Sequence, residues 1–390
     1  MKKQLTVALG LAVLATPALA SKARLQALGE STNGSFFIQD NRNIFLNAAE
    51  VNKHGDLVTF EFGSSQTTDS DTSPNAEGGI LFNRNNLVYG VHLGRVTSFD
   101  ATTEQFGGIT GAESVYRPTN AIDLFIGGDA GFKWGANLTY AKSQDDTFTP
   151  DAGTAANTVE GESQTLDLNL GVEMGNISAY VKAGILGNSE HKSPEAAAIA
   201  AEVDRKSEYE VGASYKLSDY TIFGQANMSE YDVEAGGADA NFESTFYTIG
   251  AARTERLSDR TMAFVKLSYT HLKTEGIGVD GGSVDKNEVK TTAVPLSIGL
   301  EHDATSWLIV RGSVSQNLWS NQDDDATGER TIASSTNVNA GASLKFGDLV
   351  IDGVVGTGTD GAGNITDTQS ERGVLSLSNL MTRASVTYNF

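Results

Sequence analysis

The chain of 390 residues contains no cysteine, only 6 prolines, and far fewer Lys and Arg (28) than Asp and Glu (49). The absence of cysteine excludes disulfide bonds, thiolate metal sites and thiol nucleophiles. The net charge of -21 argues against binding to nucleic acid, whose phosphates repel an acidic surface. After the first twenty residues, no stretch approaches the ~20 consecutive apolar residues of a membrane-spanning helix.

The first twenty residues have the three parts of a secretory signal peptide. Two lysines open the segment, residues 5–16 form an apolar run, and residues 18–20 (Ala-Leu-Ala) fit the small-residue cleavage site. We expect cleavage after residue 20, which removes both lysines and changes the net charge from -21 to -23. The mature chain is therefore expected to be exported and to begin at Ser21.

The mature chain repeatedly alternates apolar with polar or small residues. Residues 132–140, 166–174 and 209–217 each carry apolar side chains at every second position. This period of two is typical of a strand with one face in apolar surroundings and the other in water. Sixteen segments qualify: 57–63, 79–84, 87–94, 120–127, 131–142, 164–174, 177–187, 207–217, 219–230, 242–252, 261–272, 289–301, 305–318, 335–346, 348–356 and 380–390.

The connections between these segments alternate between short and long. Tight turns such as Asn85-Asn86 have hairpin length, whereas connections such as 64–78 and 95–119 are long and polar. An even number of strands with one short-loop end and one long-loop end is the organisation of bacterial outer-membrane barrels. The sequence therefore predicts an all-β fold, a transmembrane antiparallel β-barrel over residues 57–390 with about 16 strands, short periplasmic turns and long extracellular loops. If either of the first two segments is not a strand, fourteen strands remain a natural count.

The final strand adds a resemblance to a known class of proteins. It alternates to the end of the chain, where Tyr388 and Phe390 share one parity. This ending resembles the assembly signal that the barrel assembly machinery reads, and the chain as a whole resembles sixteen-stranded bacterial porins. The resemblance implies the outer membrane of a Gram-negative bacterium, contact with its lipids, a homotrimer, and passive diffusion of small hydrophilic solutes and ions.

Residues 21–56 lack the alternation and are expected to lie at the periplasmic rim or to plug the barrel mouth. Their order resembles the start of the long-chain fatty acid transporter family, in which an Asn-Pro-Ala motif precedes the first strand. Here Ala48 stands in place of the proline, between Asn47 and Ala49. The resemblance implies an alternative function, a substrate-specific channel for hydrophobic compounds with residues 21–56 as a hatch. A surface-structural or adhesion barrel with a blocked lumen is a further alternative.

The polar parity of the strands gives candidate pore-lining residues, because a charge facing lipid at the midplane costs about 2–4 kcal/mol for Lys or Arg. A sixteen-stranded barrel leaves an aqueous lumen for these side chains. The basic candidates are Lys133, Lys182, Lys216, Lys266, Arg311, Lys345 and Arg383. The acidic candidates are Glu61, Asp123, Asp167, Glu173, Glu210, Glu301 and Asp352.

The remaining acidic residues fall mainly in the long connections and the N-terminal segment. An acidic mouth concentrates cations, so a mild cation preference is expected. The connection 143–163 has the position at which many porins fold a loop into the pore, although the longer connection 95–119 is an alternative. Candidates for the constriction are Asp145, Asp146, Asp151 and Glu160.

No catalytic or cofactor signature stands out. The glycines of 276–281 fit a dinucleotide pattern, but they lie in an expected loop without a following helix. The five histidines have no metal-ligand spacing. The sequence therefore predicts neither an enzyme nor a cofactor or metal site.

Overall fold

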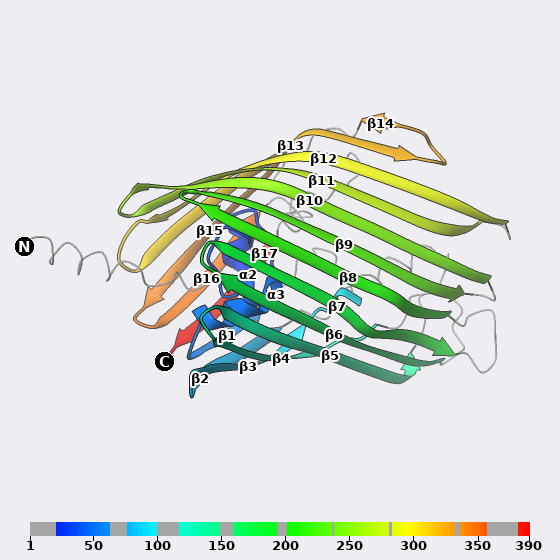
Figure 1. Ribbon diagram of the computed structural model, residues 1–390, viewed down its shortest axis with the longest axis horizontal. Helices are drawn as coiled ribbons and strands as arrows, with labels where there is room; N and C mark the ends of the chain where they lie inside the picture. Colours follow the sequence, from blue (N-terminus) through cyan, green and yellow to red (C-terminus); the bar gives the residue numbers. More distant parts are fainter. Residues whose placement is uncertain are drawn as a thin grey trace, which may run out of the picture.

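The computed structural model describes residues 21–62, 76–99, 117–148, 159–192, 201–235, 238–280, 283–331, 336–356 and 381–390. Apart from β14, each strand pairs antiparallel with the wall strands before and after it in the chain, and β1 pairs with β17, which closes the sheet into a barrel (Figure 1). The two-residue β14 pairs only at the edge of β13, so sixteen strands form the wall. The predicted fold class is confirmed.

The strands have the following bounds: β1 Leu57–Phe62, β2 Glu77–Arg84, β3 Leu87–Arg95, β4 Ala121–Asp129, β5 Lys133–Phe148, β6 Val159–Met174, β7 Ile177–Lys192, β8 Ala201–Leu217, β9 Tyr220–Ala235, β10 Ala238–Ser258, β11 Thr261–Asp280, β12 Ser283–Asp303, β13 Leu308–Asp324, β14 Arg330–Thr331, β15 Thr336–Phe346, β16 Leu349–Gly356 and β17 Met381–Asn389. The β2–β3 turn has positive φ at Asn85 and Asn86, as a tight hairpin turn with the twist of the strands requires.

The middle strands are longer than the sequence pattern predicted. The ladder between β11 and β12 runs to Asp280↔Ser283, where a long loop was expected. β9 and β10 likewise pair as far as Ala235↔Ala238. The glycines of 276–281 therefore begin in a paired strand, and the expected loop there is wrong. Hydrogen bonding between strands continues in water after the apolar alternation has ended, so the alternation marks only the apolar part of each strand.

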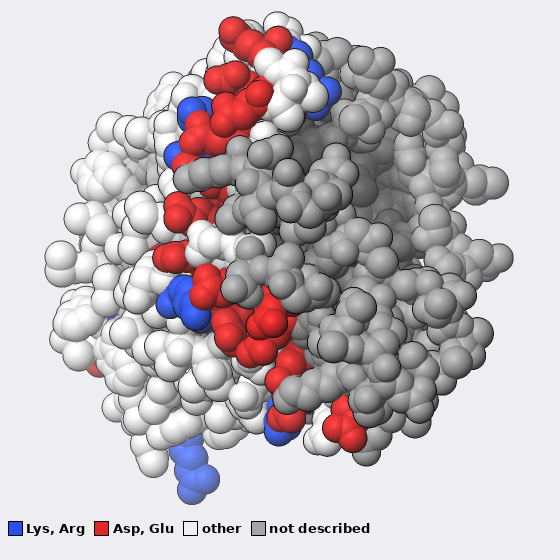
Figure 2. Space-filling model, turned by 90° about the vertical axis from the view of Figure 1, so that its right-hand side faces the viewer, with Lys and Arg blue, Asp and Glu red and all other residues white. Residues whose placement is uncertain are grey.

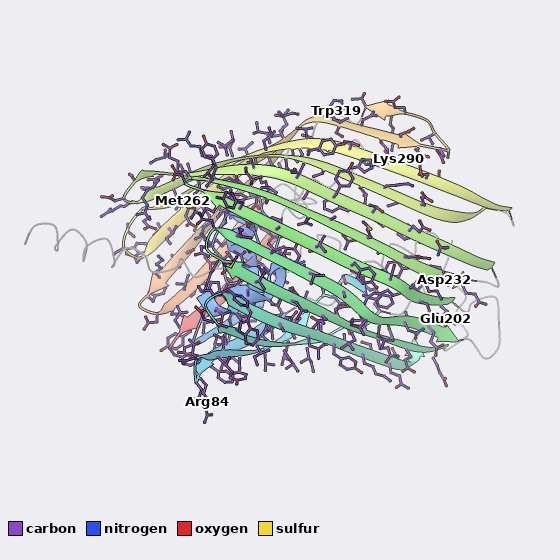
Figure 3. All side chains as sticks on the ribbon, in the orientation of Figure 1. Arg84, Glu202, Asp232, Met262, Lys290 and Trp319 are labelled. Atoms are coloured by element: carbon purple, nitrogen blue, oxygen red, sulfur yellow. The ribbon has the colours of Figure 1, made fainter. Side chains whose placement is uncertain are left out.

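The wall has an apolar outer face and a polar inner face. On β11, Val265 and Leu267 are exposed outward, while Ser268 is buried and Lys266 contacts the N-terminal segment. Side chains cover the outside along the strands, and Figure 3 places Met262 at the short-turn end and Glu202 and Asp232 at the opposite end. In the described part of the chain, no helix is long and apolar enough to span a bilayer.

Residues 21–56, hereafter the N-terminal segment, form three short helices: α2 Lys22–Ala27, α3 Asn43–Leu46 and the 3-10 helix η1 Ala48–Lys53. α2 packs against β13 and β15 to β17, whereas η1 packs against β3 to β6. The segment therefore contacts well-separated parts of the wall from inside, at the end of the barrel where the C-terminus lies (Figure 1).

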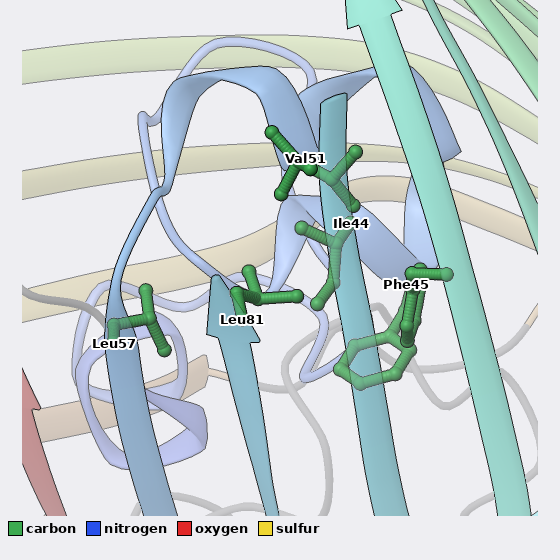
Figure 4. Packing of buried hydrophobic residues seen from close by; sticks show 7 residues of the cluster. Ile44, Phe45, Val51, Leu57 and Leu81 are labelled. Carbon is green, nitrogen blue, oxygen red and sulfur yellow. The ribbon is translucent and has the colours of Figure 1, made fainter. Parts of the chain in front are cut away.

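An apolar cluster joins the segment to the first strands. Ile44, Phe45 and Val51 pack on wall residues that include Leu57 and Leu81 (Figure 4). Leu57 and Leu81 face inward and are covered by the segment, so burial of apolar surface stabilises the position of the segment.

Candidate functional site

The lumen is the candidate site, and ion pairs fix the N-terminal segment within it. The Arg24 guanidinium donates to the Glu301 carboxylate of β12 at 2.9 and 3.1 Å, and to Asp40 of the segment at 3.0 Å. Lys22 Nζ lies 2.7 Å from Glu77 of β2, which Arg42 also contacts. Buried charges are tolerated only when they are paired. The basic residues of the segment and the wall carboxylates therefore stabilise each other only while the segment is in place.

The other side of the segment is held by Lys53 and by two amides. Lys53 Nζ lies 2.5 Å from Glu173 of β6. Asn47 donates to the Ser178 hydroxyl of β7 at 2.8 Å, and Asn52 donates to the Trp134 carbonyl of β5 at 2.8 Å. The segment is thus anchored on strands from both halves of the wall.

The residues that resemble the Asn-Pro-Ala motif lie at a close approach between segment and wall. A Cβ at Gly135 of β5 would lie 2.1 Å from the Ala48 carbonyl oxygen, and one at Gly171 of β6 would lie 1.7 Å from Asn47 Oδ1. Only glycine lets the wall backbone come this close to the segment. Larger side chains at these wall positions would displace the segment.

A cavity of about 320 Å³ lies between the segment and the wall strands β7 to β13 and β15. One part of its lining is aromatic: Phe36 of the segment stacks on Phe223 of β9 with ring centroids 5.0 Å apart. Another part is amide and hydroxyl, with Gln225 and Asn317 among its residues. The charges in the lining form the pairs Lys182–Glu210 and Lys266–Glu30, so the cavity suits neutral solutes with both apolar and polar surface.

The wall beside this cavity is interrupted at Pro295. The β11–β12 pairing stops at Leu267↔Leu296 and resumes at Thr270↔Ala293, because proline has no N–H for the ladder. On its other side, β12 pairs Val294 with Trp319 and Pro295 with Asn317, which leaves one extra residue on β13. Figure 3 shows Trp319 on this strand.

A second group enters the lumen from the connection after β3. Phe99 is buried against Val203 of β8 and against Tyr231 and Val233 of β9. The Arg205 guanidinium lies 5.0 Å from the centre of the Phe99 ring. β3 and β8 lie five strands apart in the wall, so this start of the connection 95–119 reaches across the lumen.

The long-loop end carries an acidic rim. In the register, Glu202 lies between Glu190 and Glu234, and Glu275 lies between Glu243 and Glu288. Figure 2 shows acidic side chains gathered along this rim. Like charges directly opposite one another cost stability in an antiparallel sheet, which Lys273 offsets by pairing with Glu275 and Glu288. The remaining acidic charge concentrates cations.

Burial shifts the titration of several groups of the segment. It raises the pKa of Asp40 to about 7, against the opposing effect of Arg24. Burial, together with Glu173, raises the pKa of Glu50 to about 7. Burial lowers the pKa of His54 to about 4, so this imidazole is neutral at pH 7. Lys22, Arg24, Arg42 and Lys53 carry the positive charge by which the segment contacts the wall carboxylates.

The predicted pore-lining residues lie in different surroundings. Lys182, Glu210 and Lys266 line the cavity, and Glu173 contacts Lys53. Asp167 contacts Arg205, and Asp123 contacts Arg95. Glu61, Glu301, Arg311 and Asp352 lie beneath the segment and are not free in the lumen. Lys133, Lys216 and Lys345 lie near the short-turn end, and the side chain of Arg383 is outside the described residues. Selectivity roles for these residues stay predictions.

The constriction candidates differ from their expected position. Asp145 pairs with Gly161 and Glu160 pairs with Lys192, so both lie on wall strands and not in an inward-folded loop. Asp146 lies on β5, but its side chain is outside the described residues, and Asp151 is outside them altogether.

The sequence analysis did not identify Phe99 as a residue of the lumen, because a single aromatic residue gives no periodic signal.

The residues of the expected assembly signal lie on the outer face. Tyr388 and Phe390 are exposed, with ring centroids 6.5 Å apart. The Phe390 N–H donates to the Asp56 carbonyl at 2.9 Å, which joins the chain end to the end of the N-terminal segment. Recognition by assembly machinery stays a prediction. Among the described residues, no group of three or more His, Asp or Glu side chains is arranged to hold a metal ion.

Neither protein-family models nor curated proteins match the chain. Similar solved structures include CdiB from Acinetobacter baumannii (13% identity, TM-score 0.46), which covers 86% of this chain while the chain spans 60% of CdiB. OmpT, an outer membrane protein of Vibrio cholerae, has 11% identity and TM-score 0.36, covering 86% and 97% of the two chains. The Pseudomonas putida toluene transporter TodX has 12% identity and TM-score 0.37, covering 95% and 98%. These similarities concern the barrel fold alone.

Proposed function

We propose that the chain is an outer-membrane channel for small hydrophilic and amphipathic solutes, closed at its periplasmic end by the N-terminal segment as a plug. The cavity between the segment and the wall carries this proposal. It is large enough for a small solute, and paired charges neutralise its lining. Solutes enter past the acidic rim, which favours cations over anions, and pass on when the segment moves.

The proposal requires no chemical step. Transport depends on the size of the cavity, on its lining and on the position of the segment. The outer membrane and its lipids, the barrel assembly machinery and a homotrimeric state belong to the same proposal, and all follow from the resemblance to porins. Steps of three in single-channel recordings would support the trimer.

A disulfide between segment and wall tests the gate in a chain that has no other cysteine. A Cβ at Gly29 would lie 3.4 Å from Ser313 Cβ on β13, close to the spacing of about 3.5–4.5 Å in disulfides. Gly29 has a φ of +69°, so cysteine there costs roughly 1–2 kcal/mol. We expect the oxidised Gly29→Cys/Ser313→Cys protein to lose its channel openings in a planar bilayer and to regain them on reduction.

The single variants Gly29→Cys and Ser313→Cys are the controls for this lock, and neither should respond to oxidant. In the described part of the chain the Ser313 hydroxyl has no hydrogen-bond partner, so its replacement removes no interaction of the segment. A locked protein that still conducts like the unlocked one would show that the segment is not the gate.

A second candidate is a channel that releases hydrophobic compounds sideways into the membrane, and the interruption at Pro295 favours it. Pro295→Thr supplies an N–H that lets the β11–β12 ladder close. For this candidate we expect the variant to lose uptake of a hydrophobic solute such as toluene while its KCl conductance stays the same. Unchanged toluene uptake would reject the sideways route.

A further inference from the structure

Ser21 lies buried inside the barrel next to a wall carboxylate. Its side chain and backbone are fully covered, and its hydroxyl accepts the Arg24 N–H at 3.1 Å. The next backbone N–H, that of Lys22, donates to Glu61 Oε1 of β1 at 3.0 Å. Glu61 is only 2% exposed. The position at which the sequence predicts cleavage is therefore one residue from a buried carboxylate.

The nearby cations serve a different carboxylate. Glu61 lies directly opposite Glu77 in the β1–β2 register. In the described part of the chain, the ion pairs of Lys22 Nζ and of Arg42 both go to Glu77, while the contact to Glu61 is a backbone N–H. Two carboxylates side by side repel one another, and a buried carboxylate is costly without a close cation.

Processing supplies a cation at this place. Hydrolysis of the Ala20–Ser21 peptide bond by a signal peptidase adds water, leaving a carboxylate on Ala20 and an ammonium on Ser21. Adjacent backbone nitrogens are at most about 3.7 Å apart, so the new ammonium lies close to the N–H that contacts Glu61. An ammonium buried there needs an anionic partner as much as Glu61 needs a cation.

We propose that Glu61 is the binding site for the α-ammonium of Ser21 released by signal-peptide cleavage, so that processing completes the docking of the N-terminal segment. The uncleaved precursor has an amide at this position and lacks the ion pair. Docking of the segment is then tied to maturation. The inference rests on the predicted cleavage and is independent of whether the segment gates transport.

A double-mutant cycle tests this pair on the full mature protein, folded in detergent. Glu61→Gln removes the carboxylate, and insertion of one alanine between Ala20 and Ser21 displaces the ammonium by a residue. The readout is hydrogen–deuterium exchange of residues 22–30, with the mature N-terminus identified by mass spectrometry. In the protein that begins at Ser21, we expect Glu61→Gln to speed exchange about tenfold. In the protein with the inserted alanine, we expect the same substitution to speed exchange less than about twofold.

Glu173→Gln is the matched control, because its partner Lys53 lies at the other end of the segment and its effect should be equal in both backgrounds. Equal effects of Glu61→Gln in both backgrounds would overturn the proposal, as would a mature chain that begins at a residue other than Ser21. If Glu61→Gln does not fold, the pKa of the Ser21 amine is measured by NMR after ¹³C-methylation. A value above the ordinary range of about 7.7–8.0 supports the pair, and one within or below it overturns the pair.

Discussion

Deletion of Lys22–Lys53 is expected to raise the single-channel conductance more than about tenfold, because a barrel of sixteen strands without contents encloses an aqueous channel. The deleted residues contribute α2, α3 and η1, which contact both halves of the wall. The wall itself should still close, since the β1–β17 ladder involves none of them. The wall carboxylates Glu77, Glu173 and Glu301 lose their partners on the segment but gain water, so their charges are tolerated.

Conductance in a planar bilayer checks this expectation, alongside a gel assay in which a folded barrel migrates differently before and after heating. Unchanged heat-modifiable mobility would show that the deleted chain still folds. A folded deletion protein with the conductance of the full chain would mean that the segment does not obstruct the pore. Phe99 and the residues around it would then be the candidates for the obstruction of the pore.

The barrel could be predicted from the sequence because its determinants are local and repeated. Each strand must place apolar side chains toward lipid at every second residue, as Val265 and Leu267 show, and this constraint is visible in the sequence. Sixteen such segments with alternating short and long connections are compatible with few folds other than a transmembrane barrel. The start of β1 at Leu57, the start of β3 at Leu87 and the end of β16 at Gly356 were all predicted from this pattern.

The contents of the lumen follow no periodic rule. The contact of Arg24 with Glu301 spans 277 positions in the chain, and nothing in either neighbourhood indicates it. The parity rule placed Glu301 and Arg311 inward but gave no sign that the N-terminal segment covers them. The connection 143–163 was expected to be a loop, since its polar residues end the alternation. Its strands instead continue, as the pair Asp145↔Gly161 shows.

The largest effect on stability is expected at Arg311. Its side chain and that of Asp352 are fully buried, and Arg311 Nη1 lies 2.9 Å from Asp352 Oδ1. Arg311 Nε lies 3.0 Å from Glu301, which also holds Arg24 of the segment. Arg311→Met leaves Asp352 buried without its cation, so the free energy of unfolding should fall by about 3–5 kcal/mol. Denaturant titration followed by tryptophan fluorescence measures this loss.

Two further variants separate the buried charge from the general effect of losing an arginine. Replacing both partners, as Arg311→Met with Asp352→Leu, removes the unpaired charge and should recover most of the lost stability, because apolar replacement of a buried pair is often close to neutral. Arg253→Met removes an arginine whose ion pair with Glu255 is about half exposed, and it should cost less than about 1 kcal/mol. A loss for Arg311→Met no larger than that for Arg253→Met would show that the Arg311–Asp352 pair does not stabilise the wall.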